Sequence, residues 1–179
     1  RKQLLEGSQV VVIDTNLPAE SIAWLADNCH APIFADPVST VKAEKLRPVL
    51  GKLHTLKPNR LEAELLSGVP ITGTDSLHRA AQTLLETGLH RVFISLGADG
   101  VYAADQSGSV TLPAPKAEMV STTGCGDSFM AALTWAYLQG SDLERSARAG
   151  LAASSLTMES AETIHPSMSE AELLRRMAL

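Results

Sequence analysis

The chain has 179 residues, of which 45% are hydrophobic and 20% are charged, with a formal net charge of −5. These values suit a globular protein of ordinary size with a full core, and we expect residues 1–179 to form a single domain. Aromatic residues make up only 4% of the chain, and no basic stripe interleaves with them, which argues against nucleic-acid binding. No run of about 18 apolar residues occurs, so we expect no membrane span.

The cysteines and histidines indicate neither a disulfide framework nor a zinc site. Cys29 and Cys125 sit in unrelated sequence contexts, which fits a reducing, cytoplasmic setting. The five histidines show no metal-ligand spacing with these cysteines. The chain also lacks a Gly-x-x-x-x-Gly-Lys-Ser/Thr loop, which argues against a P-loop enzyme.

The first part of the chain alternates short apolar runs with helix-like stretches. Gln9–Ile13, Pro32–Ala35 and Leu53–Leu56 are typical of buried parallel strands. A helix is expected after Pro18, and a basic, helix-compatible stretch runs through Leu50. This βαβ order predicts a three-layer α/β fold, with a mostly parallel sheet and helices on both of its faces.

Polar residues follow the predicted strands. In open α/β sheets, ligands bind beyond the carboxyl ends of the strands. We therefore expect one edge of the sheet to be lined by the residues at these ends: Asp14, Asp36, Asn59 and the turn near Gly97.

Asn59 and Glu62 stand three residues apart at the start of a predicted helix. One interpretation is structural, with Asn59 as the N-cap and Glu62 as its partner in a capping box. The other is functional, because Mg²⁺ keeps most of its waters and needs few carboxylates, so Glu62 could organise its water shell. The spacing alone leaves both interpretations open.

Arg91–Leu96 is the clearest buried strand in the sequence, and it leads into the turn Gly97–Gly100. Val101–Ala104 and Val110–Leu112 follow as two short strands joined by a turn. Such a pair predicts an antiparallel edge added to the parallel sheet.

A polar, glycine-punctuated turn runs straight into a helix in the segment Ser121–Leu133. The backbone N–H groups of Gly124, Cys125 and Gly126 would form a nest for an anion such as a phosphate. The neighbouring carboxylate of Asp127 would repel a phosphate, unless it accepts a proton from a hydroxyl that attacks that phosphate. The alternative is that Asp127 caps the helix and the glycines only make a turn.

Two more helices are expected after this segment. Asp142–Thr157 is rich in Ala and Ser, whose small side chains permit close packing against the preceding turn. Leu151 in this helix could form one wall of an apolar binding site, with simple helix packing as the alternative. Ser169–Met177 is predicted to be the final helix, capped by Ser169.

The segment Thr123–Asp127 resembles the second signature of the PfkB, or ribokinase-like, sugar and nucleoside kinases, in which a Thr-Gly-Ala-Gly-Asp run supplies the anion hole and the catalytic Asp. Cys125 replaces the small Ala or Gly of the family and is small enough to keep the turn. Ser121 stands where many members carry Asp, which puts in question only the monovalent-cation (K⁺) site of some members. The resemblance implies a ribokinase-like fold and a catalytic group made of Gly124, Cys125, Gly126 and Asp127.

Two further motifs occur in the order found in that family. Asn59-x-x-Glu62 matches its Asn-x-x-Glu motif, and Ser95-Leu96-Gly97-Ala98-Asp99-Gly100 resembles its nucleotide-contacting turn. The resemblance implies ATP and Mg²⁺ as cofactors, with Glu62 and Asn59 at the metal. It implies these nucleotide-binding residues: Asn59, Ser95, Gly97, Asp99, Gly100 and Gly126, together with Leu151 as the proposed adenine wall.

The resemblance covers most of the chain as the C-terminal, nucleotide-binding portion of a longer kinase. Family members also have an N-terminal part with sugar-binding strands and a β-sheet lid, which has no counterpart here, so we expect this portion alone to be inactive. Within the family, the segment His54–Glu64 followed by Leu66-Ser67-Gly68 is most similar to the branch that phosphorylates pseudouridine.

The function implied by the resemblance is phosphoryl transfer from ATP to a hydroxyl of a small-molecule sugar or nucleoside, and to the 5′-hydroxyl if the acceptor is pseudouridine. Two alternatives stay open. The acceptor could instead be ribose, fructose or another nucleoside, or the chain could be a module that binds nucleotide without catalysis. A homodimer of the full-length enzyme also stays open, since the lid that commonly mediates pairing in relatives is absent.

Overall fold

The computed structural model describes residues 5–178, which fall into two compact units. The first unit contains the residues up to Leu96 together with Tyr102–Ser109, and the second contains Gly97–Val101 together with the residues from Val110 onward. Each unit has a packed apolar core of its own. The single domain expected from composition stays a prediction.

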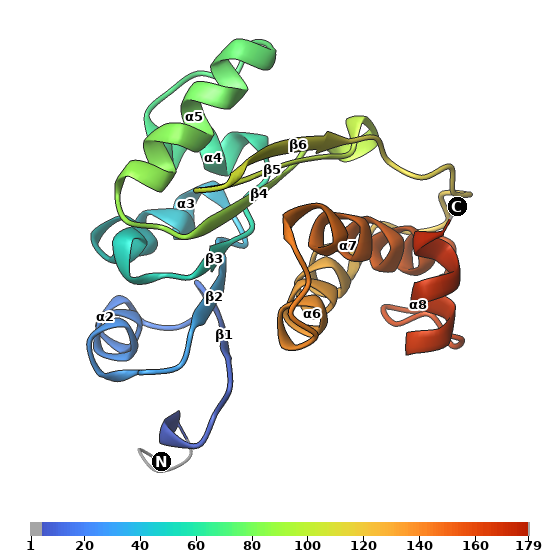
Figure 1. The fold of residues 1–179 in the computed structure, drawn as a ribbon, viewed down its shortest axis with the longest axis horizontal. Coiled ribbons are helices and arrows are strands. Elements are labelled where there is room, and N and C mark those ends of the chain that lie inside the picture. Colours follow the sequence, from blue (N-terminus) through green and yellow to red (C-terminus); the bar gives the residue numbers. More distant parts are fainter. Residues whose placement is uncertain (1–4, 179) are drawn as a thin grey trace. The chain divides into compact units, whose positions relative to one another are not determined.

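A six-stranded sheet has the spatial order β1-β2-β3-β4-β5-β6, which is also the order along the chain (Figure 1). The first four strands pair in parallel, and the β5–β6 hairpin forms an antiparallel edge, as predicted. The strands are β1 (Val11–Asp14), β2 (Ile33–Asp36), β3 (Thr55–Leu56), β4 (Arg91–Ser95), β5 (Val101–Asp105) and β6 (Gly108–Leu112).

Polar residues lie at the carboxyl ends of the parallel strands, as the sequence predicts. Asp14 is the partner of Asp36 in the register of β1 and β2. Asn59, which follows β3, forms a parallel bridge with Ser95 at the end of β4. The first unit therefore presents these four polar residues along one edge of the sheet.

The helices of the first unit bury one face of the sheet. Ile13 of β1, Ile33 of β2 and Ile94 of β4 belong to one cluster of buried side chains. Ile22 and Leu84 join this cluster from the helices, and both are fully buried. The helices are α2 (Ala19–Asn28), α3 (Thr40–Ala43), α4 (Arg60–Ser67) and α5 (Thr74–Glu86).

The basic stretch after β2 does not form one continuous α-helix. It continues from α3 into a 3₁₀ segment, η1 (Glu44–Lys52), which contains Pro48. Proline has no N–H to donate and clashes with the carbonyl four residues before it, which favours these tighter, shorter turns. Leu46, Val49 and Leu50 are nevertheless buried, so the segment still covers the core.

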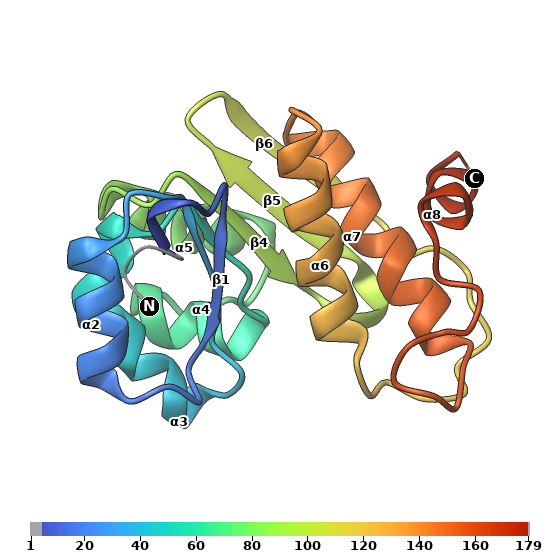
Figure 2. The same cartoon turned by 90° about the horizontal axis from the view of Figure 1, so that it is seen from below.

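The second unit is built mainly from helices, of which α6 and α7 lie side by side (Figures 1 and 2). Gly150 of α7 faces the ring of Phe129 of α6, and a Cβ at position 150 would lie 2.3 Å from that ring. The predicted close packing therefore depends on a residue without a side chain. The elements are η2 (Gly97–Asp99), α6 (Cys125–Leu138), α7 (Leu143–Met158) and α8 (Glu170–Met177).

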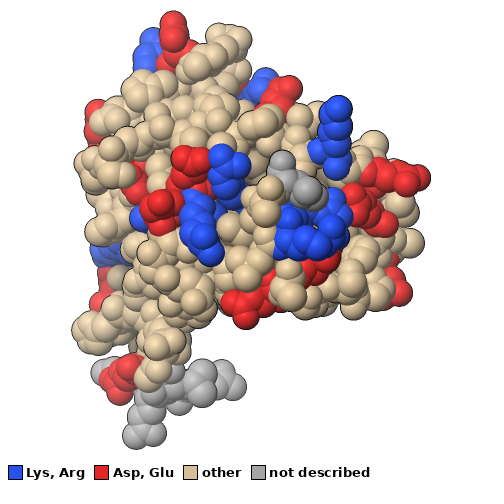
Figure 3. Space-filling view, turned by 45° about the vertical axis from the view of Figure 1, so that its right-hand side comes forward, with Lys and Arg blue, Asp and Glu red and all other residues tan. Residues whose placement is uncertain are grey.

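The helices of residues 5–178 include none that combines the length and the apolar character needed to span a bilayer. Charged side chains of both signs are interspersed on the face shown in Figure 3. This pattern agrees with the net charge of −5 and differs from the broad basic field of a nucleic-acid-binding face.

His54 lies in a stack of rings in the first unit. Its ring is 5.4 Å from that of Phe34 and 5.3 Å from that of His90, measured between centroids, and the planes are nearly parallel. Burial, and then the nearby charges of His90 and Arg91, lower the pKa of His54 from 6.5 to about 4. The unfolded chain therefore takes up this proton at a higher pH than the folded chain does.

We expect the free energy of unfolding to fall as the pH drops from 6.5 to about 4, because protonation of His54 favours the unfolded state in this window. The shift corresponds nominally to about 3 kcal/mol, which solvent screening of the half-buried ring reduces to about 1–2 kcal/mol. Urea unfolding of wild type and His54→Gln at pH 7 and pH 4 measures the difference. An identical pH dependence in both proteins would contradict this role of His54.

Candidate active site

The turn before α6 has the conformation that the sequence predicts. Gly124 is the N-cap residue with φ of +83°, a left-handed conformation that glycine adopts without strain. A Cβ at this position would lie 2.4 Å from the carbonyl oxygen of Thr163. Both the backbone angle and the close neighbour therefore require glycine.

The three amides predicted to bind an anion differ in their availability. The N–H of Cys125 donates to the carbonyl oxygen of Thr122 at 3.3 Å, which closes the turn. Within residues 5–178, the N–H groups of Gly124 and Gly126 have no protein acceptor. Two amides at the N-terminus of a 14-residue helix are thus available to an anion.

Asp127 is the third residue of α6, and its side chain is exposed. Its carboxylate caps no backbone amide in the described part of the chain, so the structure does not support the capping interpretation. The residue stands at the edge of a mostly apolar hollow of about 460 Å³, which Trp135, Ile164 and Met168 also line. The carboxylate can therefore reach a hydroxyl group brought to the end of α6.

Cys125 is held against α7. Its thiol is 3.6 Å from the carbonyl oxygen of Ser154 and 3.9 Å from that of Ser121. Burial raises the pKa of the Cys125 thiol. A helix N-terminus can lower the pKa of a cysteine, but burial acts in the opposite direction at this position.

We expect the Cys125 thiol to react slowly with iodoacetamide at neutral pH, because the thiolate is the nucleophile and burial disfavours it. In Cys29→Ser, Cys125 is the remaining thiol. Its rate of alkylation should rise with pH, and the pH at the midpoint of this rise should lie above that of an ordinary cysteine. Rapid labelling at pH 7 would show that the thiol is more exposed and more acidic than this packing allows.

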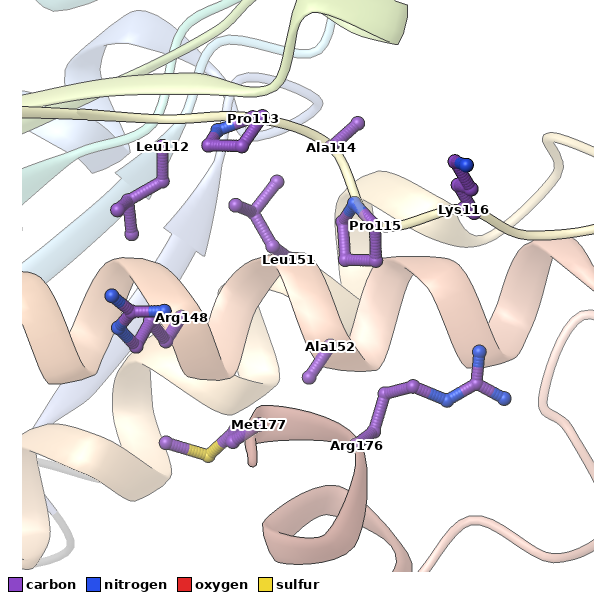
Figure 4. A pocket seen from close by; sticks show the side chains of 10 residues that line it. All are labelled: Leu112, Pro113, Ala114, Pro115, Lys116, Arg148, Leu151, Ala152, Arg176 and Met177. Atoms are coloured by element: carbon purple, nitrogen blue, oxygen red, sulfur yellow. The ribbon is translucent and has the colours of Figure 1, made fainter. Parts of the chain in front are cut away.

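Leu151 lines a cavity of about 420 Å³ in the second unit. Its side chain points from α7 toward Pro113 and Pro115 on the facing segment (Figure 4). Three cationic residues, Lys116, Arg148 and Arg176, also line the cavity. Arg148 is paired with Glu144 and Arg176 with Glu159, so the arrangement offers an apolar slot that suits a flat ring, with the charge of Lys116 beside it.

The predicted nucleotide-contacting turn includes two glycines with positive φ. Gly97 has φ of +63°, and a Cβ there would have no atom within 4 Å, so space is open beside it. Gly100 has φ of +98°, its N–H donates to the carbonyl oxygen of Gly97 at 3.1 Å, and a Cβ would lie 2.0 Å from the carbonyl oxygen of Leu112. Asp99 between them is exposed. Glycine at position 100 lets the turn pack directly on the backbone after β6.

Asn59 and Glu62 form a complete capping box in the first unit. The side-chain oxygen of Asn59 accepts from the N–H of Glu62 at 3.0 Å, and the Glu62 carboxylate accepts from the N–H of Asn59 at 2.9 Å. Glu62 is only 3% exposed, and burial raises its pKa, with a further contribution from the charge of Asp36. The carboxylate is thus fixed by the backbone and destabilised by a like charge nearby.

Sequence reasoning missed a buried ion pair next to this box. Lys57 is 6% exposed, and its ammonium lies 3.0 Å from the carboxylate of Asp36. The charge of Lys57 also lowers the pKa of Glu62. A lysine directly after β3 was the available signal, because positions at strand ends face the ligand edge.

The predicted site residues divide between the two units. Asn59, Glu62 and Ser95 belong to the first, where Ser95 N–H donates to the carbonyl oxygen of Pro58 at 2.9 Å. The second unit contains the others: Gly97, Asp99, Gly100, Gly124, Cys125, Gly126, Asp127 and Leu151. Among residues 5–178, no three His, Cys, Asp or Glu side chains are gathered for direct metal binding.

Comparison with known proteins gives consistent matches along the chain. The model of the pfkB family of carbohydrate kinases matches residues 3–171. Pseudouridine kinase of Escherichia coli K12 is 38% identical over 174 residues, which are 96% of this chain and 56% of that protein. Ribokinase of Staphylococcus aureus is 35% identical over 160 residues, which are 88% of this chain and 53% of that protein.

Solved structures agree with the sequence comparison. A sugar kinase structure from Clostridium perfringens superimposes with a TM-score of 0.94 at 34% identity, over 99% of this chain and 56% of that one. Ribokinase from Thermotoga maritima, at 24% identity, superimposes with a TM-score of 0.86 over 99% of this chain and 59% of that one. The ribokinase-like fold is therefore confirmed. The chain spans about half the length of these relatives.

Proposed function

The chain belongs to the pfkB family of carbohydrate kinases. On that premise we propose that the protein containing it transfers the γ-phosphoryl group of ATP to a hydroxyl of a sugar or nucleoside. The acceptor that the similarity favours is pseudouridine, with pseudouridine 5′-phosphate as the product. A family kinase for ribose, fructose or another nucleoside is the alternative within the same chemistry.

One observation carries the proposal: an exposed carboxylate stands in the first turn of a helix whose leading amides are available. Asp127 accepts the proton of the acceptor hydroxyl while the hydroxyl oxygen bonds to the γ-phosphorus, and the bond from that phosphorus to the β–γ bridging oxygen breaks, so ADP leaves. The N–H groups of Gly124 and Gly126 stabilise the charge on the transferred phosphoryl group. Cys125 contributes mainly the small side chain that the turn needs, because its own N–H donates to Thr122.

The cavity beside Leu151 is the proposed place for the adenine ring. Its walls are mainly apolar, with Pro113 and Pro115 opposite Leu151, as Figure 4 shows. The charge of Lys116 favours a ligand with a polyphosphate, whereas Arg148 is paired with Glu144 at 2.6 Å. Gly97, which has open space where a Cβ would lie, lets the backbone of its turn approach the nucleotide closely, and Gly100 lets the same turn pack on the backbone after β6.

Glu62 and Asn59 are the proposed residues for organising Mg²⁺ through its waters. They fit such an ion by the chemistry of their donor atoms, because Mg²⁺ takes oxygen ligands and is usually held through one or two carboxylates and its own waters, while the ammonium of Lys57 already offsets part of the repulsion between Glu62 and Asp36. When bound, Mg²⁺ neutralises phosphate charge during the transfer. Asn59 and the backbone hold the Glu62 carboxylate in a fixed orientation.

A panel of acceptors tests the proposal. The assay uses a protein that contains this chain and has the full length of its relatives. It is given ATP and one acceptor at a time (pseudouridine, uridine, ribose or fructose), and ADP release is measured. We expect the highest kcat/KM for pseudouridine. The chain alone should bind ADP weakly and turn over none of the acceptors. Binding without turnover at full length would favour the non-catalytic module.

A further inference from the structure

The end of α7 is hydrogen-bonded to the turn that precedes α6. The hydroxyl of Ser154 donates to the carbonyl oxygen of Cys125 at 2.8 Å. Three residues later, the hydroxyl of Thr157 lies 2.6 Å from that of Ser128. The carbonyl oxygen of Met158 accepts two further N–H groups from the turn, those of Val120 at 2.9 Å and Ser121 at 3.2 Å. Four bonds from one helix end thus hold the segment 120–128.

The bond from Ser154 has a directional effect on the next amide. The peptide group that joins Cys125 to Gly126 is planar and trans, so its C=O and N–H point in opposite directions. With the carbonyl oxygen of Cys125 held by the Ser154 hydroxyl, the N–H of Gly126 points in the direction opposite to that hydrogen bond. A hydrogen bond to the carbonyl also polarises the peptide group and strengthens its N–H as a donor.

The surroundings leave this arrangement little freedom. Thr157 is completely buried, and the contact between Gly150 and the Phe129 ring brings α7 close to α6. Gly124 is confined from the other side by the carbonyl oxygen of Thr163. The turn is therefore held on two sides, while the N–H of Gly126 has no protein acceptor within residues 5–178.

We propose that Ser154 and Thr157 are positioning residues that aim the Gly126 N–H at the phosphoryl group. The inference rests on the proposed function for the identity of the anion. The orientation of the amide itself depends only on contacts inside the second unit. Neither residue touches the reacting atoms, and both act through the turn.

A matched pair of variants tests the proposal. Ser154→Ala removes the hydroxyl that reaches Cys125, and Ser155→Ala removes the next hydroxyl along the helix, which donates to Ala152 within α7 at 2.9 Å. The ¹⁵N relaxation of Gly126 is measured in the ligand-free chain. We expect its order parameter to fall from about 0.85 toward 0.6 in Ser154→Ala and to stay unchanged in Ser155→Ala.

A second measurement separates this inference from the proposed function. The β,γ-imido analogue of ATP, which keeps a γ-phosphoryl group and is not hydrolysed, is titrated into each protein, and the Gly126 amide shift is followed. Ser154→Ala should weaken binding of this analogue about two- to tenfold, and Ser154→Thr should restore it. A Gly126 order parameter that is equal in wild type and Ser154→Ala overturns the positioning role. A lowered order parameter without any response of wild-type Gly126 to the ATP analogue supports the positioning role and contradicts the phosphate site.

Discussion

Replacement of Asp127 with Asn is expected to lower kcat by a factor of ~10² to 10⁴ in protein of the relatives' full length. Asparagine has nearly the same shape as aspartate but cannot accept the proton of the acceptor hydroxyl. The affinity for ATP should stay nearly intact, because the amides of Gly124 and Gly126 remain available. Steady-state assays with varied ATP and varied acceptor separate the two quantities.

Glu162→Gln is a suitable control for this experiment, since Glu162 is an exposed carboxylate in the same unit and has no part in the proposed chemistry. Its kcat should remain within about twofold of wild type, as for most surface substitutions. Full activity of Asp127→Asn would refute the assignment of the base. A large rise in the KM for ATP with unchanged kcat would instead make Asp127 a binding residue.

The second large effect is expected from Gly124→Ala, which should reduce the free energy of unfolding by about 2–4 kcal/mol. Alanine is strained at a φ of +83°, and its Cβ would lie 2.4 Å from the carbonyl oxygen of Thr163. The neighbour is backbone and cannot turn aside as a flexible side chain does. Urea unfolding monitored by tryptophan fluorescence measures the change.

Gly140→Ala separates the two causes of that effect. Gly140 also has a positive φ, +68°, but a Cβ there meets no atom within 4 Å. We expect a loss of about 1–2 kcal/mol at this position, from backbone strain alone. Equal losses at positions 124 and 140 would show that the segment at Thr163 yields and that the turn is less confined than the contact implies.

Local patterns in the sequence predict the features that depend on neighbouring residues. The spacing of Gly124 and Gly126 before an apolar helical repeat predicts the turn and the start of α6, and both are confirmed. The capping box of Asn59 and Glu62 is also predictable from a four-residue segment, and the structure contains it. In these cases a short segment satisfies its own backbone groups.

The features that sequence reasoning missed depend on residues far apart in the chain. Lys57 and Asp36 are 21 residues apart in the chain and meet only because β2 and β3 pair. The thiol of Cys125 is desolvated by α7, whose Ser154 lies 29 residues away. The pKa of the Cys125 thiol therefore depends on the helix that packs against it, and the residues next to Cys125 in the sequence do not reveal this contact.

The contact between Gly150 and Phe129 has a practical consequence for protein engineering. Phe129 follows Asp127 by two residues in α6. A change in the distance between α6 and α7 at the Phe129 ring would therefore also shift the residue proposed as the base. In a mutant library intended to broaden acceptor choice, most variants with a side chain at position 150 would fail to fold, because that side chain would clash with the Phe129 ring. Codons 129 and 150 are best randomised together, with small residues at one position for every large residue at the other.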